Sequence, residues 1–225
     1  MSKSSDRELI KLNLGCGLKA PLGWVNIDNS FTMRLSKIKI LYKLLCKIIR
    51  IDEIRWPPNI YNIDVRKGLP FKDESVKAIF TAHMLEHMSH KDANFLIKDC
   101  YRILRSGGLL RIIVPDLYRA AKNYIKASEE NPTGQHSYNF LNFIGLVPDK
   151  FDESSIGGIM RILRRSKHYY MYDEWSLKQI LEKNGFIEIK KMDYGQSRIP
   201  DIGLLEDQKI ISYEDVCAVC LEAIK

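Results

Sequence analysis

A nearly continuous apolar run that ends in a glycine turn, Leu12-Asn13-Leu14-Gly15-Cys16-Gly17, constrains this chain more than any other stretch. Such a run is typical of a strand in the interior of a parallel sheet. Because glycine has no Cβ, the turn lets backbone N–H groups approach a ligand closely. The next short apolar run, Trp24-Val25-Asn26-Ile27, ends in Asp28, an acid that can hold a ribose. Together these features predict a doubly wound sheet that binds an adenosine-containing cofactor.

The length and composition predict a single domain over residues 1–225. The chain is 45% hydrophobic and 28% charged, which is ordinary for a globular protein with one sizeable core. We expect two insertions, at about 31–58 and 129–170, to form a lid and a cap over an acceptor site. The net charge of +7 favours anionic partners, among them phosphorylated metabolites, nucleic acid and an acidic membrane surface.

The cysteines and the termini predict a cytoplasmic protein. Five cysteines are scattered without the spacing of a disulfide scaffold or a zinc site, which fits a reducing compartment. Cys217 and Cys220 lie in an apolar run that reads as a strand, so we expect them to be structural and to face opposite sides. The polar start predicts no signal peptide, and no run of about 18 apolar residues predicts a membrane span.

Short apolar runs and helical periodicity predict alternating strands and helices. The expected strands are Ile10–Leu14, Trp24–Asp28, Ile60–Asp64, Val76–Ala82, Leu109–Val114, Ile187–Met192 and Val216–Ile224. The expected helices are Met33–Arg50, Asp92–Leu104, Asp116–Ser128 and Asp173–Lys183. Ser106-Gly107-Gly108 is expected to stop the second helix. Residues 129–165 lack sustained periodicity, and we expect them to form the inserted cap, with a basic cluster at its end.

The predicted Met33–Arg50 helix has one apolar face and one basic face with no acid in it. The simplest interpretation is a surface helix packed on the core. Two alternatives stay open, a lid over the substrate cleft and an interfacial helix that contacts anionic lipid head groups.

Several motifs in this order resemble the class I S-adenosylmethionine-dependent methyltransferases, of the methyltransferase type 11 kind. The carrying residues are Leu12 to Gly17, Asp28, Asp64-Val65, Leu69-Pro70-Phe71 with Asp73, Leu85-Glu86-His87 and Leu104-Arg105-Ser106-Gly107-Gly108. Within the class, Asn26-Ile27-Asp28 after Gly23-Trp24 and the late run His168 to Asp173 resemble a subgroup associated with surface polysaccharide biosynthesis. The resemblance implies a Rossmann-like, seven-stranded sheet with the last strand antiparallel, and S-adenosyl-L-methionine as cofactor.

The resemblance also implies which residues hold the cofactor. They are Asn13, Gly15, Cys16, Gly17, Asp28, Asp64, Val65, Ala82 and His83. Asp28 would accept hydrogen bonds from the ribose hydroxyls, and Asp64 from the adenine amino group. This chain departs from the family at Asn13, where many relatives carry an acid, and it lacks the third glycine of the longer signature.

Methyl transfer to a hydroxyl requires a base, and three residues are candidates. His83, expected just beyond the fourth strand, is the first, and His168 and Asp116 follow it. His83, Glu86 and His87 fall at helical spacing, so they can also bind a divalent metal. We expect no metal, because Glu86-His87 is commonly a packing and hydrogen-bonding pair in this superfamily.

The expected activity is O-methylation of a sugar, glycan or other small anionic acceptor. The alternatives are a nucleic-acid methyltransferase, against which stands Thr81-Ala82-His83-Met84 in place of an Asn-Pro-Pro-Tyr-like sequence, and a non-catalytic cofactor-binding partner subunit. A nicotinamide oxidoreductase is disfavoured because a third glycine and a long first helix are missing. The acceptor atom and the oligomeric state stay open.

Overall fold

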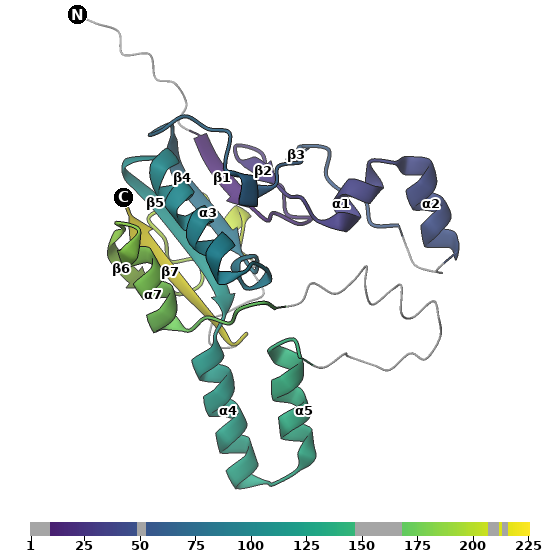
Figure 1. The fold of residues 1–225 in the computed structure, drawn as a ribbon, viewed down its shortest axis with the longest axis vertical. Coiled ribbons are helices and arrows are strands. Elements are labelled where there is room, and N and C mark those ends of the chain that lie inside the picture. Colours follow the sequence, from purple (N-terminus) through teal and green to yellow (C-terminus); the bar gives the residue numbers. More distant parts are fainter. Residues whose placement is uncertain (1–9, 49–52, 147–167, 207–211, 213–215) are drawn as a thin grey trace, which may run out of the picture.

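A seven-stranded sheet forms the centre of the molecule, in the order β3-β2-β1-β4-β5-β7-β6 (Figure 1). The computed structural model describes residues 10–48, 53–146, 168–206, 212 and 216–225. The strands are β1 (Ile10–Leu14), β2 (Val25–Ile27), β3 (Ile60–Tyr61), β4 (Val76–Ala82), β5 (Leu104–Pro115), β6 (Ile187–Lys191) and β7 (Ala218–Ile224). β7 runs antiparallel to both of its neighbours, and β1 to β5 pair in parallel. The predicted sheet with an antiparallel last strand is confirmed.

Two of the strands, β3 and β5, differ most in length from the prediction. β3 ends at Tyr61, so Asp64 stands outside the strand, where it caps a 3-10 turn, η1 (Val65–Lys67). β5 begins at Leu104, directly after a helix, and its pairing with β4 shifts register between Leu104 and Leu109. The predicted glycine stop is therefore wrong, because the helix ends when Leu104 turns to an extended conformation and the glycines fall inside the strand.

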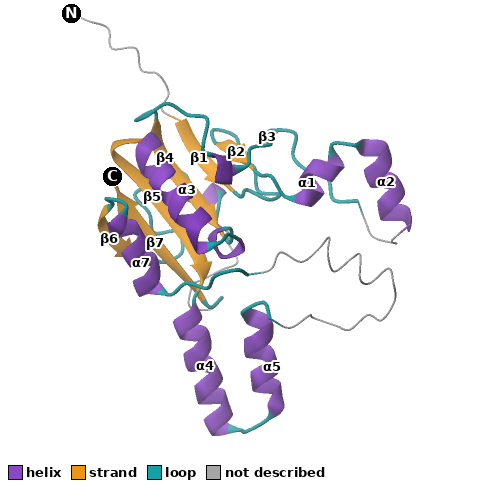
Figure 2. Cartoon of the chain, in the orientation of Figure 1, coloured by secondary structure: helices purple, strands orange, loops and turns teal. Residues whose placement is uncertain are grey.

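Helices cover one face of the sheet, and an irregular segment covers much of the other. The helices are α1 (Phe31–Ser36), α2 (Lys39–Ile48), α3 (His90–Ile103), α4 (Leu117–Glu130), α5 (Gly134–Phe143) and α7 (Glu174–Lys183). α3 and α7 lie against one face of the sheet (Figure 2). Their buried apolar residues belong to the main core. On the opposite face, Ile199 and Ile202, the first residue of the 3-10 turn η3 (Ile202–Leu204), belong to the same apolar cluster as Trp24. No helix stands between β1 and β2, as the short, proline-broken loop predicts.

The predicted helix Met33–Arg50 is two helices. α1 ends at Ser36, and α2 starts at Lys39. The Ser36 hydroxyl donates to the carbonyl of Met33 at 2.7 Å, a local bond that competes with a continuing helix. Both helices lie beyond β3, away from the centre of the sheet (Figure 1). Residues 49 and 50 of the prediction lie outside the described residues.

The second insertion contains a helix where irregular structure was expected. α5 packs against α4, with Tyr124 and Phe140 stacked at 5.3 Å between ring centroids. Sequence periodicity missed α5 because this tertiary packing, rather than a strong apolar stripe, supports it. Residues 147–167, with the predicted basic cluster of Arg161, Arg164, Arg165 and Lys167, lie outside the described residues.

All five cysteines are free thiols. Cys220 is buried in β7, but Cys217 precedes the strand and has a positive φ of 52°. The predicted strand is thus too long at its start, and the two sulfur atoms do not share a strand. Among the described residues, we find no helix of the length and apolarity that crossing a bilayer needs.

Candidate active site

A cavity of about 410 Å³ lies where β1, β2 and β4 end at their carboxyl termini. The chain leaves β1 towards β2 and β3, then returns to β4 on the other side of β1, which makes this edge a topological switch point. The lining residues are Gly15, Ile27, Asp28, Asn29, Ser30, Ile63, Asp64, Val65, Arg66, His83, Met84, His87 and Met88. Five of the predicted cofactor residues are among them: Gly15, Asp28, Asp64, Val65 and His83.

The glycine turn is shaped by a close approach between two strand ends. Gly15 has a φ of +66°, and a Cβ added there would lie 2.8 Å from the sulfur atom of Met84. Any other residue at position 15 would therefore carry both backbone strain and a clash. This contact joins the end of β1 to the segment after β4 and leaves the backbone of the turn open to the cavity.

Asp28 anchors the turn and faces the cavity. Its Oδ2 accepts from the Gly17 N–H at 3.0 Å, and its Oδ1 accepts from the Ser30 N–H at 2.7 Å. A carboxylate has about four lone-pair sites, so each oxygen can accept one more hydrogen bond. The side chain is only 7% exposed, which places these remaining sites in the cavity wall rather than in bulk water.

Asp64 lies in the same wall but is already paired. The Arg66 guanidinium donates to both carboxylate oxygens, at 2.8 Å and 3.0 Å, and the Arg66 N–H donates to Oδ1 at 3.2 Å. The hydrogen bond from Arg66 lowers the pKa of Asp64 below its ordinary value. An incoming donor would share this carboxylate with Arg66, a residue that the sequence analysis did not select.

Four predicted cofactor residues stand behind the cavity wall. They are Asn13, Cys16, Gly17 and Ala82, none of which lines the cavity. The Asn13 amide donates to the Lys19 carbonyl at 2.8 Å and to Asn26 at 3.0 Å, so it braces the glycine turn. Burial, helped by the charge of Asp28, raises the pKa of Cys16 to about 12, which keeps it a neutral thiol. Asn13 thus braces the glycine turn and does not line the cavity, whereas the resemblance implies that it contacts the cofactor.

His83 stands at the rim of the cavity beside a buried acid. It follows β4 with a φ of +50°, which is unusual for a residue other than glycine and is held by its N–H bond to the Ile113 carbonyl. Its Nδ1 lies 3.5 Å from Oε1 of Glu86, and its side chain is 56% exposed. Glu86, in the 3-10 turn η2 (Leu85–His87), is 1% exposed. The buried carboxylate is therefore the acidic group closest to the imidazole of His83 that the ion pairs of the described residues show.

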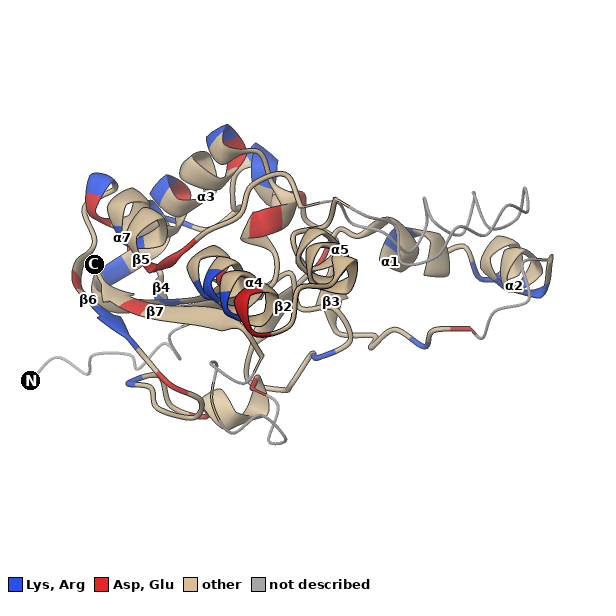
Figure 3. Ribbon diagram, turned by 90° about the horizontal axis from the view of Figure 1, so that it is seen from below, with Lys and Arg blue, Asp and Glu red and all other residues tan. Residues whose placement is uncertain are grey.

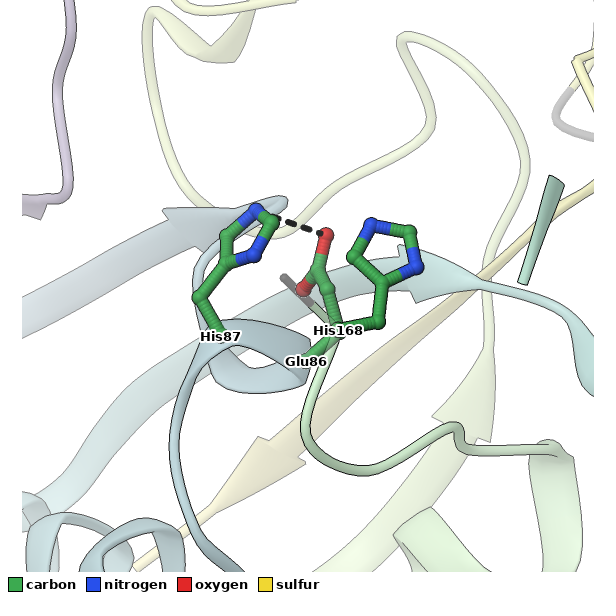
Figure 4. Close-up of side chains that lie close together, drawn as sticks. All are labelled: Glu86, His87 and His168. Atoms are coloured by element: carbon green, nitrogen blue, oxygen red, sulfur yellow. Dashed lines mark ion pairs between the residues drawn. The ribbon is translucent and has the colours of Figure 1, made fainter. Parts of the chain in front are cut away.

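The late segment brings His168 to the same turn. The Tyr169 N–H donates to the Glu86 carbonyl at 2.7 Å, and the Tyr170 N–H donates to it at 3.3 Å. The His168 ring lies 5.0 Å from the His87 ring, centroid to centroid. Figure 4 shows His87 and His168 on opposite sides of the Glu86 carboxylate. Two candidate bases from distant parts of the chain, His83 and His168, are therefore both neighbours of Glu86.

Asp116, the third candidate base, lies elsewhere. It caps α4 by accepting from the Arg119 N–H at 3.1 Å, and it is 5% exposed. It lines a separate cavity with Tyr118, Arg119, Lys122, Asn123, Lys126, Glu174, Trp175 and Lys191. The structure does not bring Asp116 together with His83 and the cavity after β1.

Sequence reasoning missed Met84, Met88 and Arg66 as lining residues. Methionine in an apolar run usually fills a core, so its pattern gave no signal of a cavity. Arg66 follows Asp64 by two residues, and that spacing was the available signal for their pairing.

Comparison with known proteins finds a similar domain family over part of the chain. Residues 12–112 match the family model described as a methyltransferase domain. No curated protein sequence matches this chain. The fold is similar to a methyltransferase from Thermotoga maritima described as a possible histamine N-methyltransferase, with 17% identity, a TM-score of 0.48 and coverage of 96% of this chain and 82% of that one. It is also similar to one from Archaeoglobus fulgidus, with 14% identity, a TM-score of 0.48 and coverage of 96% and 86%.

Proposed function

We propose that this chain is an S-adenosylmethionine-dependent methyltransferase, as its match to a methyltransferase domain over residues 12–112 supports, and that it methylates a hydroxyl of an anionic sugar or glycan acceptor. The observation that carries the proposal is the His83–Glu86 pair at the open rim of the cavity, 3.5 Å from Nδ1 to Oε1. A sugar hydroxyl is a poor nucleophile until its proton is removed, and this pair is built to remove it.

The residues around the cavity fit the cofactor. Gly15 lies in the cavity wall, and Asp28 offers unused lone pairs for the two ribose hydroxyls. Asp64 and Val65 lie in the wall where the adenine ring would be held. The cofactor supplies a methyl group that is bonded to a sulfonium sulfur. The sulfur is the leaving group, and it becomes a neutral thioether. The protein therefore has to align the acceptor, exclude water and take one proton.

His83 would take that proton. Its contact with Glu86 favours the tautomer in which Nδ1 carries the hydrogen, which leaves Nε2 as the acceptor. The exposed side chain lets a large acceptor reach it. Glu86 then stabilises the imidazolium that forms, as the buried acid of a catalytic triad does.

An anionic acceptor agrees with the charge of the chain. The net charge is +7, and Arg66 lies in the cavity wall. Guanidinium groups recognise carboxylates and phosphates in two-point contacts. Uronate or phosphate groups of glycan intermediates present such oxygens. The end of α5 lies close to the late segment, because a Cβ added at Gly145 would lie 3.2 Å from the His168 ring.

Replacement of His83 by Asn should lower methyl transfer by about 10²- to 10⁴-fold, the usual contribution of a general base. The measurement is incorporation of labelled methyl groups from the cofactor into fractions of a cell extract, followed by the mass of the product. The affinity for S-adenosylhomocysteine should fall much less than the rate, because His83 acts on the acceptor although it also lines the cofactor cavity.

His136→Asn, on α5, is the matched histidine control and should transfer at the normal rate. Equal rates for His83→Asn and the wild type would exclude His83 as the base. Label in an RNA fraction, lost at high salt, would replace the sugar with a nucleic acid. Cofactor binding with no labelled product in any fraction would favour a non-catalytic partner subunit.

We further propose that the enzyme works in the cytoplasm at a membrane surface. α2 presents an apolar row to solvent at Ile40, Leu44 and Ile48, spaced four residues apart, and Ile40 is 86% exposed. Beside it runs an exposed row of Lys39, Lys43 and Lys47. Residues 29–51 contain no acid, and Figure 3 shows the basic residues on α2.

The opposite side of α2 is already packed. Tyr42 and Cys46 are buried, and the Tyr42 hydroxyl accepts from the Ile54 N–H at 2.9 Å. The helix is thus fixed to the protein by one side while its apolar row and its lysines face outward. An apolar row flanked by cations is complementary to the surface of an anionic bilayer, where lipid-linked sugars are found.

The double substitution Ile40→Asp with Leu44→Asp should abolish sedimentation with phosphatidylglycerol vesicles. Wild-type binding should weaken as salt rises and be absent from phosphatidylcholine vesicles, because the lysines supply part of the attraction. Ile125→Asp, at an apolar residue on α4 that is as exposed as Leu44, is the control and should still bind. Absence of wild-type binding, or dimerisation that the α2 substitutions abolish, would reject the membrane contact.

A further inference from the structure

Three metal-binding side chains converge beside the cofactor cavity. One ligand atom from each of Glu86, His87 and His168 lies within 4.8 Å of the other two (Figure 4). Glu86 and His87 come from η2, and His168 comes from the segment before α7, about 80 residues further along the chain. This group differs from the sequence-based alternative of His83, Glu86 and His87, because His168 replaces His83.

The buried carboxylate supplies an independent sign of a missing partner. Glu86 is 1% exposed, and its Oε2 has no hydrogen-bond partner among the described residues. An unpaired oxygen of a buried carboxylate is costly unless a cation or a donor compensates it. Its other oxygen, Oε1, lies 3.5 Å from His83 and 3.9 Å from His87.

Backbone contacts hold the three side chains together without a metal. The Tyr169 and Tyr170 N–H groups fix the late segment to the Glu86 carbonyl. Gly145 lies against the His168 ring, where an added Cβ would approach to 3.2 Å. Sites whose ligands are already positioned bind metals with little rearrangement of the chain.

We propose that Glu86, His87 and His168 bind a divalent transition-metal ion, of the Mn²⁺, Fe²⁺ or Zn²⁺ type. Two imidazoles and one carboxylate suit these ions better than Mg²⁺ or Ca²⁺, which prefer oxygen ligands. Three protein ligands leave coordination positions open, as in catalytic sites. His87 also lines the cofactor cavity, so the three side chains border the reaction site.

The role of the ion rests on the proposed function, whereas its binding does not. An ion here would hold the acceptor oxygen and acidify its hydroxyl, so that His83 takes the proton more readily. The anionic groups of the acceptor would strengthen this contact. The expected absence of a metal in the sequence analysis would then be revised.

The test is a titration of the full-length protein with Co²⁺, in the absence of cofactor and acceptor. We expect one ion per chain and visible d–d absorption bands, and competition by Mn²⁺ or Zn²⁺. His87→Ala and His168→Ala should each weaken binding by at least about tenfold. His136→Ala should bind as the wild type does, since it removes a histidine on α5, outside the cluster.

Calorimetric binding of S-adenosylhomocysteine and far-UV circular dichroism check that each variant is folded. Lack of saturable binding by the wild-type protein would overturn the proposal, even if a variant fails to fold. Binding that survives both substitutions, or that His136→Ala weakens equally, would also overturn it. Because the titration contains no acceptor, a metal site and an unproductive transfer assay would be two separate results.

Discussion

Asp28→Ala should weaken the affinity for S-adenosylhomocysteine by at least about hundredfold. The substitution removes the two acceptors proposed for the ribose hydroxyls, and charge-assisted hydrogen bonds contribute about 1.5–3 kcal/mol each. It also frees the Gly17 and Ser30 N–H groups, which Asp28 holds at 3.0 Å and 2.7 Å, so the glycine turn loses its anchor. Isothermal titration calorimetry measures the effect directly.

Asp28→Asn separates these two contributions. The amide oxygen of the new side chain can still accept one backbone hydrogen bond. The affinity of Asp28→Asn for S-adenosylhomocysteine should therefore lie between those of the wild type and Asp28→Ala. Glu182→Gln, on the exposed side of α7, is the control for loss of one negative charge and should bind normally. Equal affinities for Asp28→Ala and the wild type would place the ribose elsewhere.

Arg111→Met should lower the free energy of unfolding by about 3–5 kcal/mol, the usual result of removing one partner from a buried ion pair. Arg111 is fully buried in β5, and its guanidinium lies 2.6 Å from Glu206 and 3.6 Å from Glu222. It also donates to the carbonyls of Gln196 and Asp193. Methionine has a similar volume, so the loss would come mainly from buried Glu206 left without its cation, because Glu222 keeps its ion pair with Arg198 at 2.9 Å.

Urea denaturation at neutral pH gives the free energy. Lys178→Met, which removes the exposed pair between Lys178 and Glu182 on α7, should change stability by less than about 1 kcal/mol. An Arg111→Met loss of similar size to that control would contradict the account. The contacts of Arg111 also hold residues 193–206 over the sheet face opposite α3. The Arg111→Met substitution should therefore loosen the packing of Ile199 in the folded protein.

Much of the fold could be predicted because its central strands have a strong local pattern. β1, β4 and the Leu109–Val114 part of β5 are mostly apolar and largely buried. A glycine turn with two following acids indicated the cofactor edge. The helix break after Ser36 and the whole of α5 escaped prediction because they depend on a side-chain hydrogen bond and on packing against α4. Neither of these features changes the spacing of apolar residues along the sequence.

The site was predictable in its parts rather than in its assembly. Asp28, Asp64 and His83 follow strand ends that share one edge, so the topology alone brings them together. The bracing role of Asn13 required its contacts with Lys19 and Asn26, since a polar residue in a strand has the same pattern whichever way it points. The approach of His168 to Glu86 depends on the backbone bonds of Tyr169 and Tyr170, which no sequence spacing encodes.

A crystal structure of the complex with S-adenosylhomocysteine tests the central claim most directly. The account predicts that the ribose hydroxyls contact the Asp28 carboxylate, that the adenine ring lies beside Asp64 and Val65, and that the sulfur atom points towards His83. A ligand in the cavity lined by Asp116 and Trp175, or a ribose more than about 3.5 Å from Asp28, would contradict it.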